Sequence, residues 1–151
     1  MATLSALEEL DRCKYLFLSG ISEPEENSLR IVVQEGLCAG AAETLNIGSF
    51  SIENVLPIDV TSNSRTFILF WPNYISYAVR NESYCAWDKE ETWKGSGFRI
   101  YTKSKFLTFV ENATFATEDY PGPFRHYSVL FSNHLIDIAS QNPPIIQIIN
   151  S

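Results

Sequence analysis

The chain has 151 residues, of which 45% are apolar and 19% are charged. This length and composition are typical of a single globular domain spanning residues 1–151, and they exclude an intrinsically disordered chain. The net charge of −7 excludes the basic surface that nucleic-acid binding needs, and no apolar run approaches the roughly 18 residues of a membrane span.

The acidic excess lies entirely in the first part of the chain. Residues 1–64 carry ten acidic and three basic side chains, whereas residues 65–151 carry eight of each. Acidic side chains also fall within the first twenty residues, where a secretory signal needs a basic start and an apolar run. We therefore expect a cytoplasmic protein that contacts neither membrane nor nucleic acid.

The three cysteines, Cys13, Cys38 and Cys85, are odd in number and share no C-x-x-C spacing. Only two histidines accompany them, so the pattern predicts neither a disulfide scaffold nor a zinc site. We expect three reduced thiols, no metal and no cofactor.

The first predicted element is a short helix over residues 3–12. Leucines recur there at every third position, and Ser5 and Glu8 have the spacing of a capping box. Two β-rich runs follow, residues 14–20 and 28–36, and the acidic, proline-containing loop between them predicts a hairpin. Residues 36–49 are small and unpatterned, which leaves a loop or a short helix through Ala41 to Leu45.

The central part of the chain predicts strands at residues 53–61, 65–71 and 74–81. The Pro72-Asn73 pair has the chemistry of a tight turn, so we expect the second and third of these strands to form a hairpin. One face of this hairpin is apolar or aromatic throughout, and we expect it to be core: Ile68, Phe70, Ile75, Tyr77 and Val79.

The last part predicts a strand at residues 97–103 and a helix at 103–112. A strand competes with that helix, but the polar breaks at Thr108 and Glu111 favour helix. A second hairpin joins residues 125–131 to 134–140 through Ser132 and Asn133, and an apolar tail follows. Together the elements predict a single α+β domain, mainly an antiparallel β-sheet of about six to eight strands with one or two short helices.

Three segments carry a resemblance to a known family. They are YISYAVRNESY at residues 74–84, GFRIYTKSKFL at 97–107 and PGPFRHYSVLFSNHLIDIASQNPPII at 121–146. This combination resembles a family of small, uncharacterised bacterial proteins, and the likeness covers roughly residues 55–149. The resemblance implies no catalytic residue, and it suggests a role akin to toxin immunity.

The second predicted hairpin places His126, Ser128 and Asp137 on one side. A serine, a histidine and an acid close together suggest a hydrolase, in which the histidine takes the serine proton and the acid orients the ring. However, an activated serine normally stands on a strand-to-helix turn of the G-x-S-x-G kind, and Ser128 would lie within a strand without oxyanion donors. We therefore favour a structural hydrogen bond between His126 and Asp137.

The polar run from Arg80 to Ser83 follows an aromatic strand and has two interpretations. As a structural latch, its side chains would bond loop backbone groups, and Glu82 would accept from Arg80 or another cation. As a binding site, Arg80 and Glu82 would line a cleft with aromatic neighbours, because tryptophan, tyrosine and arginine dominate contact energies. The full set of candidate binding residues is Arg80, Glu82, Tyr84, Trp87, Trp93, His126 and Asp137.

Three functions follow from these patterns. The sequence has no P-loop, dinucleotide fingerprint or HExxH helix, so the leading hypothesis is a protein-binding or inhibitor domain, immunity-like and without catalytic activity, whose partner is another protein. The alternatives are a small-molecule binding module around Arg80, Glu82, His126 and Asp137, and a hydrolase-like enzyme centred on His126.

Overall fold

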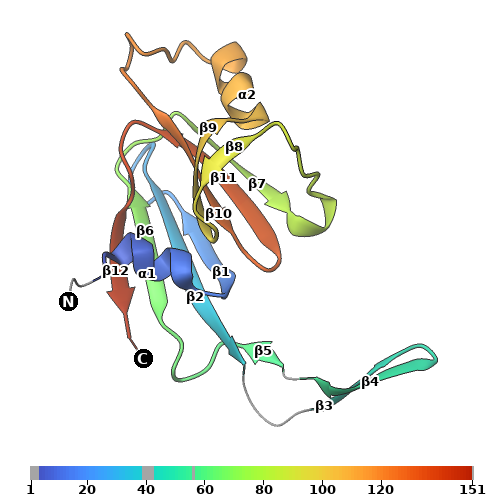
Figure 1. Cartoon of the computed structure of the whole chain (residues 1–151). Helices are drawn as coiled ribbons and strands as arrows, with labels where there is room; N and C mark the ends of the chain where they lie inside the picture. Colours follow the sequence, from blue (N-terminus) through green and yellow to red (C-terminus); the bar gives the residue numbers. More distant parts are fainter. Residues whose placement is uncertain (1–3, 39–42, 56, 151) are drawn as a thin grey trace.

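The computed structural model describes residues 4–38, 43–55 and 57–150, and Figure 1 shows their arrangement. Two antiparallel sheets form the body of the protein. The first, sheet 1, has the order β1 (Tyr15–Ser22), β2 (Leu29–Cys38), β6 (Thr66–Trp71) and β12 (Ile145–Ile149), with β5 (Ile58–Asp59) also paired to β2. The second, sheet 2, has the order β7 (Ser76–Asn81), β11 (His134–Ser140), β10 (Arg125–Leu130), β9 (Phe98–Lys103) and β8 (Thr92–Lys94).

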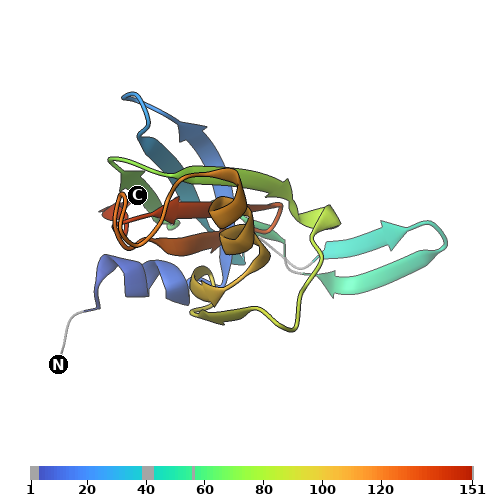
Figure 2. The same ribbon diagram turned by 90° about the horizontal axis from the view of Figure 1, so that it is seen from above.

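The remaining elements are short. They are the helices α1 (Ala6–Arg12) and α2 (Lys105–Ala113), a 3-10 turn η1 (Glu82–Tyr84), and the hairpin of β3 (Glu43–Ile47) with β4 (Phe50–Val55). This hairpin projects away from both sheets (Figure 2). No helix in the described ranges is long and apolar enough to cross a membrane. The α+β class with mainly antiparallel strands is confirmed.

The core lies between the two sheets, because strands of both supply its buried side chains. Phe67, Leu69 and Trp71 of β6 and Tyr127 and Val129 of β10 belong to one cluster of buried residues. The rings of Trp71 and Tyr127 meet at 6.2 Å across the interface. Burial of each such side chain contributes about 1.5 to 3 kcal/mol, so this contact between sheets is a main source of stability.

Both predicted helices are confirmed, and each begins at a serine cap. Ser5 and Glu8 form the expected capping box at α1, and Leu10 of this helix is fully buried in the core. Ser104 caps α2 by accepting a hydrogen bond from the Leu107 amide. Because local spacing determines such caps, the sequence was sufficient to locate both helices.

Two of the predicted hairpins are also confirmed. β1 pairs antiparallel with β2. β10 pairs with β11 in the predicted register, with Ser128 opposite Asp137 and Leu130 opposite Leu135. The Phe131 amide donates to the His134 carbonyl at 2.9 Å, which closes the two-residue loop.

The predicted hairpin between residues 65–71 and 74–81 is wrong. β6 lies in sheet 1 and β7 in sheet 2, because the backbone between them bonds to other segments. The Tyr74 amide donates to Asn27 of the β1–β2 loop at 3.2 Å, and the Ile75 amide donates to Ala139 of β11 at 2.8 Å. The chain therefore crosses between the sheets at this point instead of reversing.

This crossing also changes which face is core. On β6 the fully buried side chains are Phe67, Leu69 and Trp71, whereas the predicted core residues Ile68 and Phe70 are only half-buried. Val79, predicted as core, is 45% exposed. The expectation of one sheet of six to eight strands is wrong for the same reason, since the strands divide between two sheets.

The unpatterned region at residues 36–49 contains strand where it is described. β2 extends to Cys38 and β3 begins at Glu43, so a helix is wrong for residues 43–45, and residues 39–42 lie outside the described ranges. The strand predicted at 53–61 is divided between the end of β4 and β5.

Candidate functional site

The candidate site lies on the face of sheet 2 that points away from the core. Tyr127 and Val129 of β10 face sheet 1, so their neighbours His126 and Ser128 face outward, because strand side chains alternate. His126 lies opposite Tyr101 of β9, and Asp137 of β11 lies between Ser128 and Ala78 of β7.

A chain of hydrogen bonds crosses this face from α2 to β7. The Ser104 hydroxyl lies 2.7 Å from His126 Nδ1, and His126 Nε2 lies 2.7 Å from Asp137 Oδ1. Arg80 Nη2 donates to the other carboxylate oxygen of Asp137 at 3.0 Å. The predicted contact between His126 and Asp137 is confirmed, and it continues in both directions.

The neighbouring groups indicate which atoms donate and which accept in this series of hydrogen bonds. The Leu107 amide donates to Ser104 Oγ at 3.0 Å, and an ionised carboxylate such as Asp137 can only accept. In the neutral imidazole tautomer with its hydrogen on Nε2, Nδ1 accepts from the Ser104 hydroxyl. His126 Nε2 then carries the hydrogen that Asp137 accepts. Every polar atom of the buried imidazole has a partner, as buried polar groups require.

Two aromatic rings contact the imidazole. The ring of Tyr101 stacks on His126 at 4.3 Å with an interplanar angle of 13°. Phe106 of α2 contacts the same ring at 4.8 Å. His126 is 2% exposed, and burial raises the pKa of the neighbouring Tyr101 phenol. The histidine is therefore held in place by its neighbours, and it forms part of the floor of a pocket.

A pocket of about 310 Å³ opens above this floor. Strands β7, β9, β10 and β11 form its base, and α2 with the η1–β8 loop forms its walls. The lining residues are Ala78, Arg80, Ala86, Asp88, Glu91, Tyr101, Lys105, Phe106, Phe109, His126 and Asp137. Ser104 is not among them.

The charges that line the pocket are paired within the protein. Arg80 bonds to Asp137, and Lys105 Nζ lies 3.6 Å from Asp88. Glu91 accepts the Lys105 amide at 2.9 Å. A hydrogen bond from the Glu90 amide is the main reason that the pKa of Asp88 lies below its usual value. The side chains of Asp88 and Glu91 are thus engaged by contacts within the chain.

An aromatic rim continues from the pocket along β9. The Arg99 guanidinium lies over Trp93 at 4.3 Å and over Trp87 at 5.5 Å. Trp93 also contacts Tyr101 at 5.6 Å, and Arg99 Nη1 donates to the Tyr101 hydroxyl at 3.2 Å. Cation–π contacts of this kind hold exposed rings in place.

The structure brings together most of the predicted site residues. Arg80, His126 and Asp137 meet in the pocket, and Trp87 and Trp93 form the rim beside it. The other two candidates, Glu82 and Tyr84, lie on η1 at the surface and do not line the pocket.

The contacts of the polar run agree in part with the structural interpretation, and the binding site stays a prediction. Asn81 caps η1 by accepting a hydrogen bond from the Ser83 amide at 3.0 Å. This contact is of the kind expected for a structural latch. Arg80 instead bonds to Asp137, so the expected pair of Arg80 with Glu82 is wrong. The cross-strand register brings Arg80 near an acid that is distant in sequence.

Ser128, the serine that was considered and disfavoured for a hydrolase, makes no hydrogen bond to His126. Ser128 is fully buried, and its hydroxyl has no hydrogen-bond partner within the described part of the chain. Ser104, which caps α2, bonds to His126 instead. Ser104 is buried and does not line the pocket, so a ligand in the pocket has no access to its oxygen.

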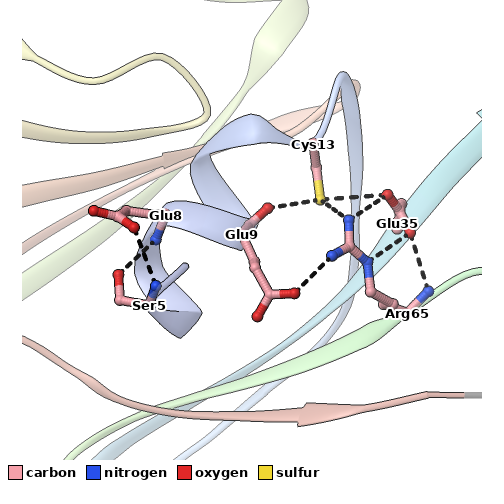
Figure 3. A network of polar contacts seen from close by, with 6 residues as sticks. All are labelled: Ser5, Glu8, Glu9, Cys13, Glu35 and Arg65. Carbon is pink, nitrogen blue, oxygen red and sulfur yellow. Dashed lines mark hydrogen bonds and ion pairs between the residues drawn. The ribbon is translucent and has the colours of Figure 1, made fainter. Parts of the chain in front are cut away.

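A second polar cluster lies far from this face and ties α1 to sheet 1 (Figure 3). The Arg65 guanidinium donates to both oxygens of Glu35, at 3.1 and 2.9 Å, and to Glu9 of α1 at 3.2 Å. The Cys13 thiol points into this cluster, where burial and the Glu35 carboxylate raise its pKa to about 12. Such a thiol is unreactive at neutral pH, so the cluster is structural.

Comparisons with known proteins give no further assignment. No family model, no curated protein and no solved structure matches the chain.

Proposed function

We propose that the protein is a non-catalytic recognition domain that binds another protein through the outer face of sheet 2. One observation carries this proposal. Among the aromatic side chains whose exposure the structure describes, all those that are at least 38% exposed come from residues 84–120: Tyr84, Trp87, Trp93, Phe109, Phe115 and Tyr120. This segment forms the rim of the pocket, α2 and the loop after it.

The type and the placement of these side chains support protein recognition. Tyr84 is 86% exposed and Trp87 is 59% exposed, although large apolar groups are normally buried. Tryptophan, tyrosine and arginine supply most of the binding energy in protein interfaces. Arg99 fixes two of the rings before binding, which lowers the entropy cost of contact. The pocket beside the rim accommodates one side chain of a partner.

Inhibition is the most concrete version of this proposal. The resemblance to small bacterial proteins suggests an immunity-like role, in which the domain covers the surface of a toxin. Catalysis is disfavoured because Ser104 serves as a helix cap and lies outside the pocket, so a substrate in the pocket does not reach its hydroxyl.

A capture experiment tests the proposal. The wild-type chain, a Tyr84→Ser/Trp87→Ser variant and an Ile21→Ser control are immobilised and exposed to lysate of the native host. Ile21 is an exposed apolar side chain on β1 of the other sheet, so it controls for general stickiness. We expect the wild type and the control to retain the same protein, and the double variant to lose about tenfold or more of it. Equal retention by all three would refute the proposed surface.

Small-molecule binding is the second candidate, because the pocket has a preformed polar floor and aromatic walls. Its charges are internally paired, which favours a largely uncharged ligand. Ala78→Phe fills the pocket from β7 without touching the rim. A metabolite that raises the melting temperature of the wild type but not of Ala78→Phe would favour this candidate, and a flat response across a broad panel would count against it.

A further inference from the structure

The outermost strands of the two five-stranded sheets differ in how they are protected from pairing with another chain. An exposed edge strand offers unpaired backbone groups, and proteins normally protect it with bulges, charges or shortness. β1 has a register shift between Leu18 and Gly20. β8 has only three residues and a shift between Thr92 and Trp93. β7 carries Arg80.

β12 has none of these protections. Its five residues, Ile-Ile-Gln-Ile-Ile, pair with β6 in an unbroken register. The strand itself contains no charge and no proline. In sheet 1 it pairs with β6 on one side, and no other described strand lies beyond it (Figure 1). High β-propensity without charge makes such a segment prone to associate with another strand.

The exposure of β12 alternates along the strand. Ile145 is 63% exposed and Ile149 is 44% exposed, with the exposed Gln147 between them on the same face. Ile146 and Ile148 point to the other face and pack against the core. One face therefore continues the core, and the other leaves isoleucine in contact with solvent.

The sequence of β12 reads the same in both directions about Gln147. In an antiparallel pair of two copies centred on Gln147, Ile145 lies opposite Ile149 of the second copy, and Ile146 lies opposite its Ile148. Residues directly opposite share a face. Exposed isoleucines would then cover one another, and the two half-buried isoleucines would extend both cores. The two glutamines meet at the axis, where each amide has a donor and an acceptor for the other.

Charge favours the same location. Two copies of a chain with net charge −7 repel each other wherever their acidic surfaces meet. Residues 138–151 contain no charged side chain, so the two paired strands themselves bring no like charges together. The acidic residues nearest to β12 are those of α1, Glu8, Glu9 and Asp11, because this helix contacts the strand.

We propose that two copies of the chain associate through β12 in an antiparallel pair centred on Gln147. This pair joins sheet 1 of one copy to sheet 1 of the other in one continuous sheet. The contact is isologous, so it closes as a dimer and leaves no free β12 edge for further growth. A five-residue edge is small for an interface, so the dimer is weak and forms at about micromolar or higher concentration.

Charge substitutions test the register of this pair. Ile145→Lys with Ile149→Lys places like charges directly opposite one another in both cross-strand pairs, whereas Ile145→Lys with Ile149→Glu places opposite charges there. All these side chains are solvent-exposed in the single chain, so each variant is expected to fold. Circular dichroism and thermal unfolding verify this.

Sedimentation velocity at protein concentrations from about 1 to 200 µM is the measurement. We expect the wild type, the lysine–glutamate variant and an Ile21→Lys control on β1 to approach twice the chain mass of 17.1 kDa. We expect the double-lysine variant to remain a monomer, although its net negative charge is smaller. A monomeric wild type would overturn the proposal. So would larger polymers, or a lysine–glutamate variant that behaves like the double-lysine variant.

Discussion

Arg65 joins three parts of the chain at one point. Its guanidinium binds Glu35 of β2 and Glu9 of α1, and its backbone amide donates to Glu35 at 3.2 Å. These hydrogen bonds are the main cause that lowers the pKa of Glu35 from the usual value of 4.5. A carboxyl group with a lowered pKa in the folded state stabilises the fold above the unfolded pKa, and this contribution is lost as the pH falls through the folded value.

The stability of the wild type is therefore expected to fall on acidification below about pH 4.5 more steeply than that of Glu35→Gln. At pH 7 the variant should be less stable by about 1 to 2 kcal/mol, because Arg65 loses its charged partner. Urea denaturation from pH 7 to pH 3 measures both effects. Glu26→Gln, at an exposed position of the β1–β2 loop, is the control. Parallel curves for the wild type and Glu35→Gln would contradict the assignment.

The proximity of two candidate-site residues could be predicted because both lie on the same predicted hairpin. His126 and Asp137 follow from the alternation of β10 and β11, since the two-residue loop fixes their register. Ser104 and Tyr101 were not predictable as their partners, because the contact joins the β9–α2 junction to β10. No local pattern in a single sequence records such a contact.

At the scale of elements, α2 depends on Ser104 in two ways. The side chain caps the helix through the Leu107 amide and hydrogen-bonds to His126 Nδ1 on the sheet. At α1, Ser5 makes only the exposed capping-box contacts. Loss of the α2 cap therefore leaves a buried histidine nitrogen without its partner, whereas loss of the α1 cap does not.

Ser104→Ala is expected to lower the free energy of unfolding by about 2 to 3 kcal/mol, from the cap and from the unsatisfied imidazole together. Ser5→Ala is expected to cost about 0.5 to 1 kcal/mol. Chemical denaturation followed by far-UV circular dichroism compares the two variants with the wild type. Equal losses would mean that the hydrogen bond to His126 adds nothing to the cap.

Elements with local signals were predicted correctly, and those defined by distant contacts were not. The caps of α1 and α2 and the loop of β10–β11 lie within a few residues of what they control. The Pro72-Asn73 segment also carries a turn signal, yet Asn27 and Ala139 bind the following amides. Tyr74 and Tyr77 further donate to Glu23 of the β1–β2 loop, at 2.8 and 3.1 Å. These contacts override the local preference for a hairpin.

At the scale of the whole molecule, the contact of Trp71 with Tyr127 joins the two sheets. Trp71 is fully buried, and removing its ring opens a cavity at the centre of the interface. A truncation of this size in a core typically costs about 3 to 5 kcal/mol.

Trp71→Ala is accordingly expected to lose about 3 to 5 kcal/mol and to unfold both sheets in one transition. Ile21→Ala, at an exposed position of β1, is expected to change stability by less than about 0.5 kcal/mol. Urea denaturation by circular dichroism gives the free energies, and amide hydrogen exchange reports each sheet separately. Protection lost in only one sheet would show that the sheets unfold independently.

The two sheets differ in how the polypeptide supplies their strands. Sheet 2 is built from the continuous stretch between residues 76 and 140, whereas sheet 1 combines β1, β2 and β6 with β12 from residues 145–149. A nascent chain leaves the ribosome in sequence order, and neighbouring segments associate first. β1, β2 and β6 can thus pair before sheet 2 has emerged, but one edge of β6 stays unpaired until β12 follows the last strand of sheet 2.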